Sequence, residues 1–359
     1  MGHQELILIR LPGRPVADGW GHASNRSKGA GQLMMVTILI ALAAGSASAL
    51  MFASIISGAL ISLVLFYLAP LPLMVAGLGW GPLTATIGGI AAALGLGAVF
   101  GLPYCLAFVL TIALPAWWLG HLALLGRPIA AAPSAGNGAA APAPAMEWYP
   151  IGRILLWTAG FAALTTMAAL FTLGSDAATI SGALRRGLLR IVGTRSAAPA
   201  TGDAEQVIDA LVAIAPAAAS IVAMMTLTLN LWLAAKITAT SGRLHRPWPD
   251  IKSAALPPMT LAALALTLAL CFTGGLLAML GQIASAALMM AYALIGFAVL
   301  HTLTLAMKSR ALWLSATYAV VLVFGWPAVA MVGLGLADAV FGFRQRYLQR
   351  RTPPPVPSS

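Results

Sequence analysis

The sequence predicts an all-α, polytopic transmembrane helical bundle of about 8–10 membrane segments, and three observations support this fold class. The chain is 60% hydrophobic and only 8% charged, with a mean hydropathy of +0.92, whereas ordinary globular domains carry roughly 25% charged residues. The stretch 65–101 has no charge and many Gly and Pro residues, which membrane helices tolerate when their neighbours satisfy the freed backbone groups. The basic residues lie in short runs between apolar segments, as the positive-inside rule expects.

The formal net charge of +11 comes from 20 Lys and Arg against 9 Asp and Glu. A nucleic-acid-binding protein could show the same balance, but the distribution of these charges favours anionic membrane lipids as partners and no nucleic acid. The two cysteines, Cys105 and Cys271, both lie in apolar runs and are interpreted as small buried hydrophobic residues. No spacing of Cys and His suggests a metal, and no cofactor is expected.

The N-terminal part divides into a polar tail and a membrane region. Residues 1–31 are Gly-rich and basic and are expected to be a disordered cytosolic tail, with translation starting at Met1 or later, at Met34 or Met35. The apolar run after the tail resembles a cleaved signal peptide, but apolar sequence continues beyond it, which favours a membrane span. The region 32–125 is predicted to contain spans at about 33–52, 55–76, 82–100 and 103–125, of which 82–100 could be kinked or re-entrant.

Residues 126–150 form an Ala/Pro-rich linker before a second membrane region, 151–348. Arginines alternate with leucines in the segment 174–213, which predicts an amphipathic helix on the membrane surface. Spans are expected near 151–173, 214–236, 257–279, 283–306 and 311–341, the last interrupted at Gly325–Pro327. The final residues, 349–359, are expected to be a disordered tail.

The basic loops do not fit a simple topology with nine straight crossings. The positive-inside rule predicts that 237–255 and the C-terminal arginines both face the cytoplasm. A hairpin at Gly325–Pro327 would allow this, whereas a re-entrant 82–100 would place 174–205 inside and 237–255 outside. We expect cytoplasmic exposure of 237–255.

Catalytic motifs are absent from the sequence. It contains no GxSxG, HExxH or Walker A pattern, no GxGxxG between a strand and a helix, and no pair of carboxylates within an apolar run. No catalytic residue is therefore predicted, and the protein is not expected to be an enzyme.

Polar residues inside apolar runs are costly and invite a functional explanation. For Asn230 the alternatives are a hydrogen bond between helices, which is favoured, and contact with a substrate. For Asp338 a salt bridge to Arg344 or an interfacial position is favoured over a proton relay. The loop Arg243–Asp250 is either a solvated basic loop anchored by Trp248 or a docking surface.

Three stretches together resemble the YybS-like family of predicted bacterial membrane proteins, which is defined by a domain of unknown function. They are YLAPLPLMVAGLGWGPLTA at 67–85, NLWLAAKITATSGRLHRPWPDI at 230–251 and LGLADAVFGFRQR at 334–346. The resemblance covers roughly 33–348 and implies a multi-pass protein of the bacterial inner membrane. It extends distantly to the substrate-binding membrane components of energy-coupling-factor vitamin transporters, which implies a membrane protein partner or an ATPase module.

These observations predict a transporter-like component that binds a small hydrophobic or vitamin-like molecule and is energised by a partner. The alternative is a non-transporting membrane scaffold or envelope assembly factor, and a lipid enzyme is a third, less favoured possibility. The residues expected to bind substrate are Pro70, Pro72, Gly77, Gly79 and Asn230. The residues expected to contact a partner or lipid are Arg243, Arg246, Trp248 and Arg344.

Overall fold

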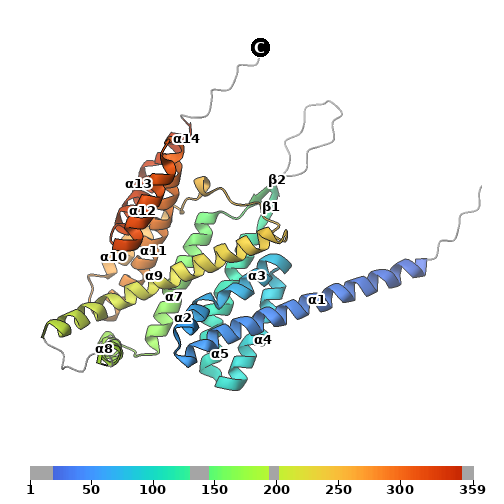
Figure 1. The fold of residues 1–359 in the computed structure, drawn as a ribbon, viewed down its shortest axis with the longest axis horizontal. Helices are drawn as coiled ribbons and strands as arrows, with labels where there is room; N and C mark the ends of the chain where they lie inside the picture. Colours follow the sequence, from blue (N-terminus) through green and yellow to red (C-terminus); the bar gives the residue numbers. More distant parts are fainter. Residues whose placement is uncertain (1–18, 130–144, 194–201, 350–359) are drawn as a thin grey trace, which may run out of the picture.

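A computed structural model describes residues 19–129, 145–193 and 202–349. Within these ranges the chain is almost entirely helical, and seven helices or helix pairs are long and apolar enough to cross a membrane. This confirms the predicted all-α bundle of a multi-pass membrane protein. Buried hydrophobic residues in these ranges form three clusters, and Figure 1 shows α1 extending well beyond the other helices.

The first membrane region consists of helices separated at proline and glycine. Gly81 and Gly101 adopt positive φ angles of 97° and 89° and are each followed by a helix with Pro in its first turn. Proline at the start of a helix loses no intrahelical hydrogen bond, so the breakers divide the segment without disrupting its helices. The elements are α1 (Gly19–Ala53), η1 (Ser54–Ser57), α2 (Leu60–Leu68), α3 (Pro70–Trp80), α4 (Pro82–Phe100), α5 (Leu102–Phe108), the π-helical turn η2 (Val109–Ala113) and α6 (Leu114–Leu124).

The beginning of α1 corrects the expected boundary of the N-terminal tail. The tail was predicted to be disordered over 1–31, but the helix already begins at Gly19. Helix propagation costs far less than nucleation, so a stable membrane helix can continue into a polar flank that would not form a helix alone. Residues 1–18 lie outside the described part of the chain.

The predicted linker 126–150 is partly structured. Its two ends form the antiparallel strands β1 (Gly126–Ile129) and β2 (Ala145–Trp148), with Gly126 opposite Trp148. An exposed ion pair between Arg127 and Glu147 links them. The Ala/Pro-rich middle, 130–144, is not among the described residues.

The second membrane region contains one helix that is longer than predicted and one that is shorter. The expected surface helix and span around Pro216 form a single helix, α9, which runs through the proline. The span expected at 257–279 is only a 12-residue helix, α10, because Gly274 and Gly275 turn the chain at positive φ. The elements are α7 (Ile151–Phe171), α8 (Ala177–Gly193), α9 (Gly202–Thr240), η3 (Ile251–Ser253), α10 (Met259–Leu270), α11 (Gly275–Leu303), η4 (Thr304–Ala306), α12 (Arg310–Phe324), α13 (Ala328–Phe341) and α14 (Phe343–Gln349).

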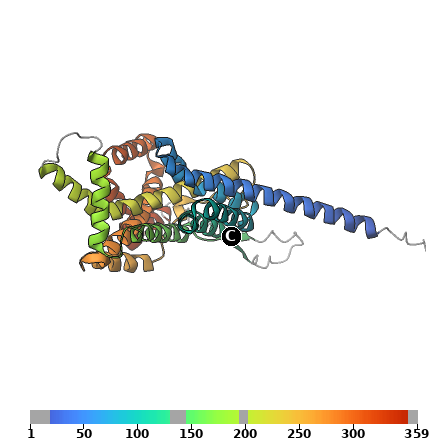
Figure 2. The same cartoon turned by 90° about the horizontal axis from the view of Figure 1, so that it is seen from below.

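Helix α8 lies across the long helices. Figure 2 shows α8, in lime green, running roughly perpendicular to α1 and α9. Ile180 is fully buried, whereas Arg186 and Arg190 are exposed. Asp176 caps the helix through hydrogen bonds from the backbone and side chain of Thr179, which lower the pKa of its carboxyl group. This arrangement fits the amphipathic surface helix predicted within 174–213.

Contacts between loops show which ends of the helices share one side of the bundle. Arg246, in the loop after α9, contacts the end of α6 and the start of α7. A guanidinium nitrogen of Arg344 lies 3.5 Å from the carbonyl oxygen of Lys252 in the same loop. The β-hairpin, the 241–258 loop and α14 therefore lie at one end, away from α8 (Figure 1).

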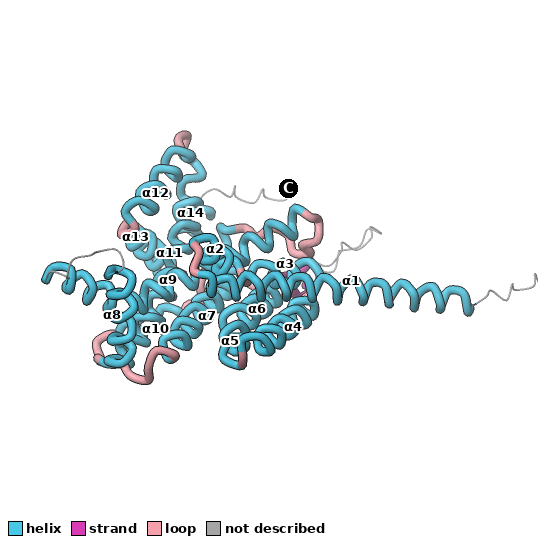
Figure 3. The backbone as a smooth tube through the Cα atoms, turned by 60° about the horizontal axis from the view of Figure 1, so that its bottom comes forward, coloured by secondary structure: helices cyan, strands magenta, loops and turns pink. Residues whose placement is uncertain are grey.

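The last predicted span is a helical hairpin. Helices α12 and α13 are joined at Gly325–Pro327, where the sequence predicted a break, and Figure 3 shows the pair beside α11. Arg310, at the start of α12, contacts His301 near the end of α11, and Arg344 follows α13. Both ends of the hairpin therefore lie on the side of the 241–258 loop, which agrees with the hairpin alternative of the predicted topology.

Candidate functional site

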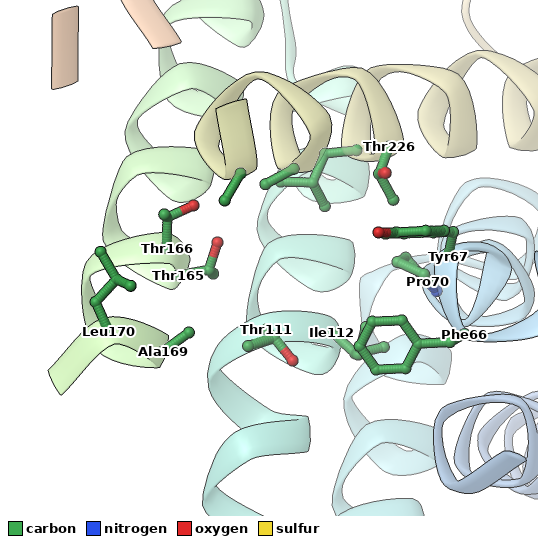
Figure 4. Close-up of a pocket in the computed structure, with 13 residues that line it drawn as sticks. Phe66, Tyr67, Pro70, Thr111, Ile112, Thr165, Thr166, Ala169, Leu170 and Thr226 are labelled. Atoms are coloured by element: carbon green, nitrogen blue, oxygen red, sulfur yellow. The ribbon is translucent and has the colours of Figure 1, made fainter. Parts of the chain in front are cut away.

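A pocket of about 220 Å³ lies beside the break between α2 and α3. Its walls come from α2 and α3, the π-helical turn, α7 and α9, four segments that are far apart in the sequence (Figure 4). The lining residues are mostly apolar with several hydroxyl groups: Phe66, Tyr67, Pro70, Thr111, Ile112, Thr165, Thr166, Ala169, Leu170, Ala219, Ala223, Thr226 and Leu227. The sequence predicted substrate-binding residues in the Pro/Gly-rich segment and at Asn230.

The break that forms one wall is supported by Asn230. Pro70 has no N–H group, so a continuous helix cannot form through it without losing a hydrogen bond. The side-chain nitrogen of Asn230 donates hydrogen bonds of 2.8 Å to the carbonyl oxygens of Tyr67 and Thr226. Asn230 is buried, and it therefore links α9 to the interrupted helix, as the favoured interpretation of its sequence position predicted.

A second irregularity faces the same pocket. Thr111 and Ile112 belong to the π-helical turn that separates α5 from α6. Such turns insert one extra residue into a helix and often occur at functional sites. The pocket thus lies between two interrupted spans, which is where transporters commonly place their binding sites.

The hydroxyl groups determine which ligand chemistry the pocket favours. Those of Thr111, Thr165 and Thr166 donate to carbonyl oxygens of their own helices at 2.7–3.2 Å. Each hydroxyl has a single proton and two lone pairs, so these threonines can only accept hydrogen bonds from a ligand. Figure 4 shows the Tyr67 hydroxyl directed across the pocket toward the threonines of α7. No charged side chain lines the pocket among the described residues.

The predicted substrate residues have different positions. Pro70 lines the pocket, whereas Asn230 only supports its wall and Pro72 lies outside the lining. Gly77 and Gly79 are packing positions, since added Cβ atoms would lie 3.2 Å from Ala85 Cβ and 3.4 Å from Thr238 Cγ2. These glycines allow α3 to pack closely against α4 and α9.

The threonines were not singled out from the sequence. Threonine within an apolar span is common because its hydroxyl can donate a hydrogen bond to a backbone carbonyl oxygen in the preceding turn of its own helix. The available signal was that Thr165, Thr166 and Thr226 lie in predicted spans, but nothing in the sequence shows that they share a cavity with Thr111.

The basic loop after α9 is tied to the rest of the protein. Arg246 donates hydrogen bonds of 3.1 and 3.0 Å to the carbonyl oxygens of Ala123 and Tyr149. Burial lowers the pKa of its guanidinium group. Arg243 lies 4.4 Å from the ring centre of Trp80, and Lys236 lies 4.4 Å from that of Trp248.

These contacts bear on the expected partner-binding residues. Arg243 and Trp248 remain exposed, whereas Arg246 is half-buried and joins α6, β2 and the loop. The expectation of a simply solvated basic loop is therefore wrong for Arg246. Its donors hydrogen-bond to backbone carbonyl oxygens at a helix end and a strand end.

Arg344 also differs from its expected role in partner or lipid contact. Its side chain is 7% exposed, and its Nε donates to the carboxylate of Asp338 at 2.7 Å. The backbone N–H of Arg344 donates to the same carboxylate at 2.9 Å. The predicted Asp338–Arg344 salt bridge is confirmed. The expectation that Arg344 contacts a partner or lipid is wrong, because its guanidinium group is buried against the carboxylate of Asp338.

Comparisons with protein families, with curated proteins and with solved structures found no match to this chain.

Proposed function

We propose that this protein is a substrate-binding component of a transport system, in the bacterial inner membrane, for a small neutral and mostly apolar molecule. The observation that carries the proposal is the pocket of about 220 Å³ at two interrupted spans. Binding sites are typically concave and mainly apolar, with a few polar groups that fix the orientation of the ligand.

The chemistry of the lining narrows the class of substrate. The pocket offers threonine lone pairs and one phenol, and its described lining has no charge to balance a phosphate or carboxylate. A molecule with an aromatic or aliphatic body and one or two hydrogen-bond donors fits this lining. In this proposal a partner supplies the energy for transport, and we expect that partner to be a separate ATPase module.

The scaffold alternative receives less support from the structure. It relied on the basic loops and the 174–205 surface helix for partners, but in the loop after α9 the side chain of Arg246 contacts other parts of this chain. Contacts within the chain do not recruit a partner, so binding in the pocket is the better supported function.

The test uses two alanines on α9 that differ in the face they present. Ala223 lines the pocket, whereas Ala218 is exposed and does not line it. We expect native mass spectrometry of the full-length protein, released from nanodiscs, to detect a bound small molecule. The Ala223→Phe variant should lose that molecule because the added ring fills the pocket, and Ala218→Phe should keep it.

A second measurement tests the transport role. A deletion strain should take up the identified molecule more slowly, and the Ala223→Phe gene should not restore uptake. Equal retention of the molecule by the Ala223→Phe variant, with both variants folded, would contradict the binding site. Retention that depends on Ala223 but with normal uptake in the deletion strain would contradict the transport role alone.

A further inference from the structure

A second and larger cavity lies between α9, α11 and the α12–α13 hairpin. Its volume is about 730 Å³, within the range of roughly 300–1,000 Å³ that is usual for ligand sites. Methionines and aliphatic residues form most of its wall, including Met225, Met289, Met290, Val321 and Val329. None of these residues lines the pocket beside Pro70.

Helix α12 lines this cavity without packing tightly on any part of the chain that the structure describes. None of its fifteen residues is buried. An empty cavity forfeits dispersion contacts on its walls, and an apolar cavity does not hold water well. In a membrane the available apolar filler is a lipid chain.

One end of the cavity is polar. Tyr318 of α12 lines the wall, stacks on Phe297 at 5.1 Å between ring centres and hydrogen-bonds His301 Nε2 at 2.8 Å. The carbonyl oxygen of His301 is in turn 3.5 Å from Nη2 of Arg310. These successive contacts lead from the apolar wall to the guanidinium group of Arg310 at the start of α12.

Arg310 has only part of its hydrogen-bonding capacity satisfied, by the distant carbonyl oxygen of His301. Its Nε is buried without a hydrogen-bond partner, and no carboxylate among the described residues forms an ion pair with it. The residue as a whole is half-buried, and an N–H donor that is buried without an acceptor is costly. Guanidinium groups bind phosphate oxygens through two parallel hydrogen bonds, so a phosphate would satisfy this residue.

Two neighbouring features favour the same anion. Helix α12 begins at Arg310 with no side-chain cap, and although the N–H of Arg310 donates to the carbonyl oxygen of Met307, the first turn has no side-chain acceptor. Lys308, two residues earlier, is exposed and carries a further positive charge. This end also lies on the side of the other basic loops, and anionic lipids are concentrated in the cytoplasmic leaflet that such loops face.

We propose that the cavity between α9, α11 and the α12–α13 hairpin binds an anionic phospholipid. One acyl chain occupies the methionine-rich cavity, and the phosphate is bound by Arg310 and the start of α12, with Lys308 adding charge. The lipid completes the packing of α12 against the bundle. The inference does not depend on the ligand of the pocket beside Pro70, because the two cavities share no lining residue.

The test measures lipid retention by the full-length protein in native mass spectrometry, with phosphatidylglycerol and phosphatidylcholine as probes. We expect the protein to retain phosphatidylglycerol in preference. Arg310→Gln should weaken this retention about tenfold, which corresponds to about 1.4 kcal/mol, because the phosphate loses hydrogen bonds to a charged donor. Arg186→Gln, which removes an exposed charge on α8, is the matched control and should have no effect.

The acyl-chain position is tested separately on α12. Val321→Trp narrows the cavity and should lower retention, whereas Val323→Trp adds the same bulk at a residue that is 73% exposed and should not. If Arg310→Gln fails to fold, Arg310→Lys keeps the charge but loses the two-pronged geometry and should weaken retention by a smaller factor.

Three results of the retention measurements would each overturn the proposal. They are equal retention of phosphatidylcholine, unchanged retention in the folded Arg310 variant, and unchanged retention in Val321→Trp. Displacement of the lipid by millimolar inorganic phosphate would show a site for free anions and would also overturn it.

Discussion

The two arms of the C-terminal hairpin are similar in length and apolar character, but they pack very differently. Helix α13 buries Val332, Gly335 and Asp338 against the rest of the protein, whereas α12 buries no residue. The difference lies in which side chains each arm presents to α11. Helix α13 places Gly335 directly against the backbone of α11, whereas α12 contributes large residues such as Tyr318 and Val321 to a cavity wall.

The comparison shows what holds helices together in this membrane protein. Lipid tails are as apolar as leucine, so large apolar side chains gain little by leaving lipid for a protein surface. Close backbone contact and satisfied polar groups are gained only within the protein. At Gly335 an added Cβ would overlap the carbonyl oxygen of Tyr292, and at Gly296 one would overlap that of Met331. The α11–α13 contact is therefore made between backbones.

The largest expected effect comes from breaking the buried ion pair after α13. Asp338→Ala leaves the guanidinium of Arg344 buried without its partner, which we expect to lower the free energy of unfolding by about 3–5 kcal/mol. Thermal or denaturant unfolding in detergent would measure the change. The exposed pair Arg127–Glu147 is the matched control, and Arg127→Ala should change stability by less than about 1 kcal/mol.

A double variant separates the cost of an unpaired charge from the value of the pair. Replacing both residues, Asp338→Leu with Arg344→Met, removes the buried charges and should recover most of the lost stability. A single Asp338→Ala variant as stable as the natural protein would show that α13 does not depend on this contact.

An intermediate effect is expected at the glycine contact with α11. Gly335→Ala forces two backbones apart and should destabilise the protein by about 1–3 kcal/mol. Gly333 lies on the same helix with no atom within 4 Å of an added Cβ, so Gly333→Ala should be neutral or slightly stabilising. Equal unfolding midpoints for the two variants would remove close backbone packing as the explanation for the stability of α13.

The sequence was informative where a feature is local. The break at Gly325–Pro327 follows from glycine and proline, the Asp338–Arg344 pair joins residues six positions apart, and the bonding of Asn230 follows from a polar group in an apolar run. The amphipathic character of α8 is local as well. Each of these features is visible within one or two turns of sequence.

The candidate site depended on contacts that no local pattern contains. Asn230 bonds to Tyr67, which is 163 positions away, and Arg246 bonds to Ala123. The pocket joins threonines from three spans whose relative rotation is set by packing. The position of α13 beside α11 likewise rests on glycine pairs, and the sequence contains many other glycines that make no such contact.

The smallest effect is expected on α12, and it completes the contrast with α13. Leu322 is 85% exposed. Its side chain therefore contacts lipid or detergent, which fills the space that Leu322→Ala leaves, and stability should change by less than about 0.5 kcal/mol. Leu288 is buried at the centre of α11, and Leu288→Ala should cost about 2–5 kcal/mol through the cavity it leaves. Both variants remove the same atoms, so their difference in unfolding free energy measures packing within the protein against exposure to its surroundings. A large loss at Leu322 would mean that α12 packs against a partner that covers this face, and the two arms of the hairpin would then be held by different neighbours.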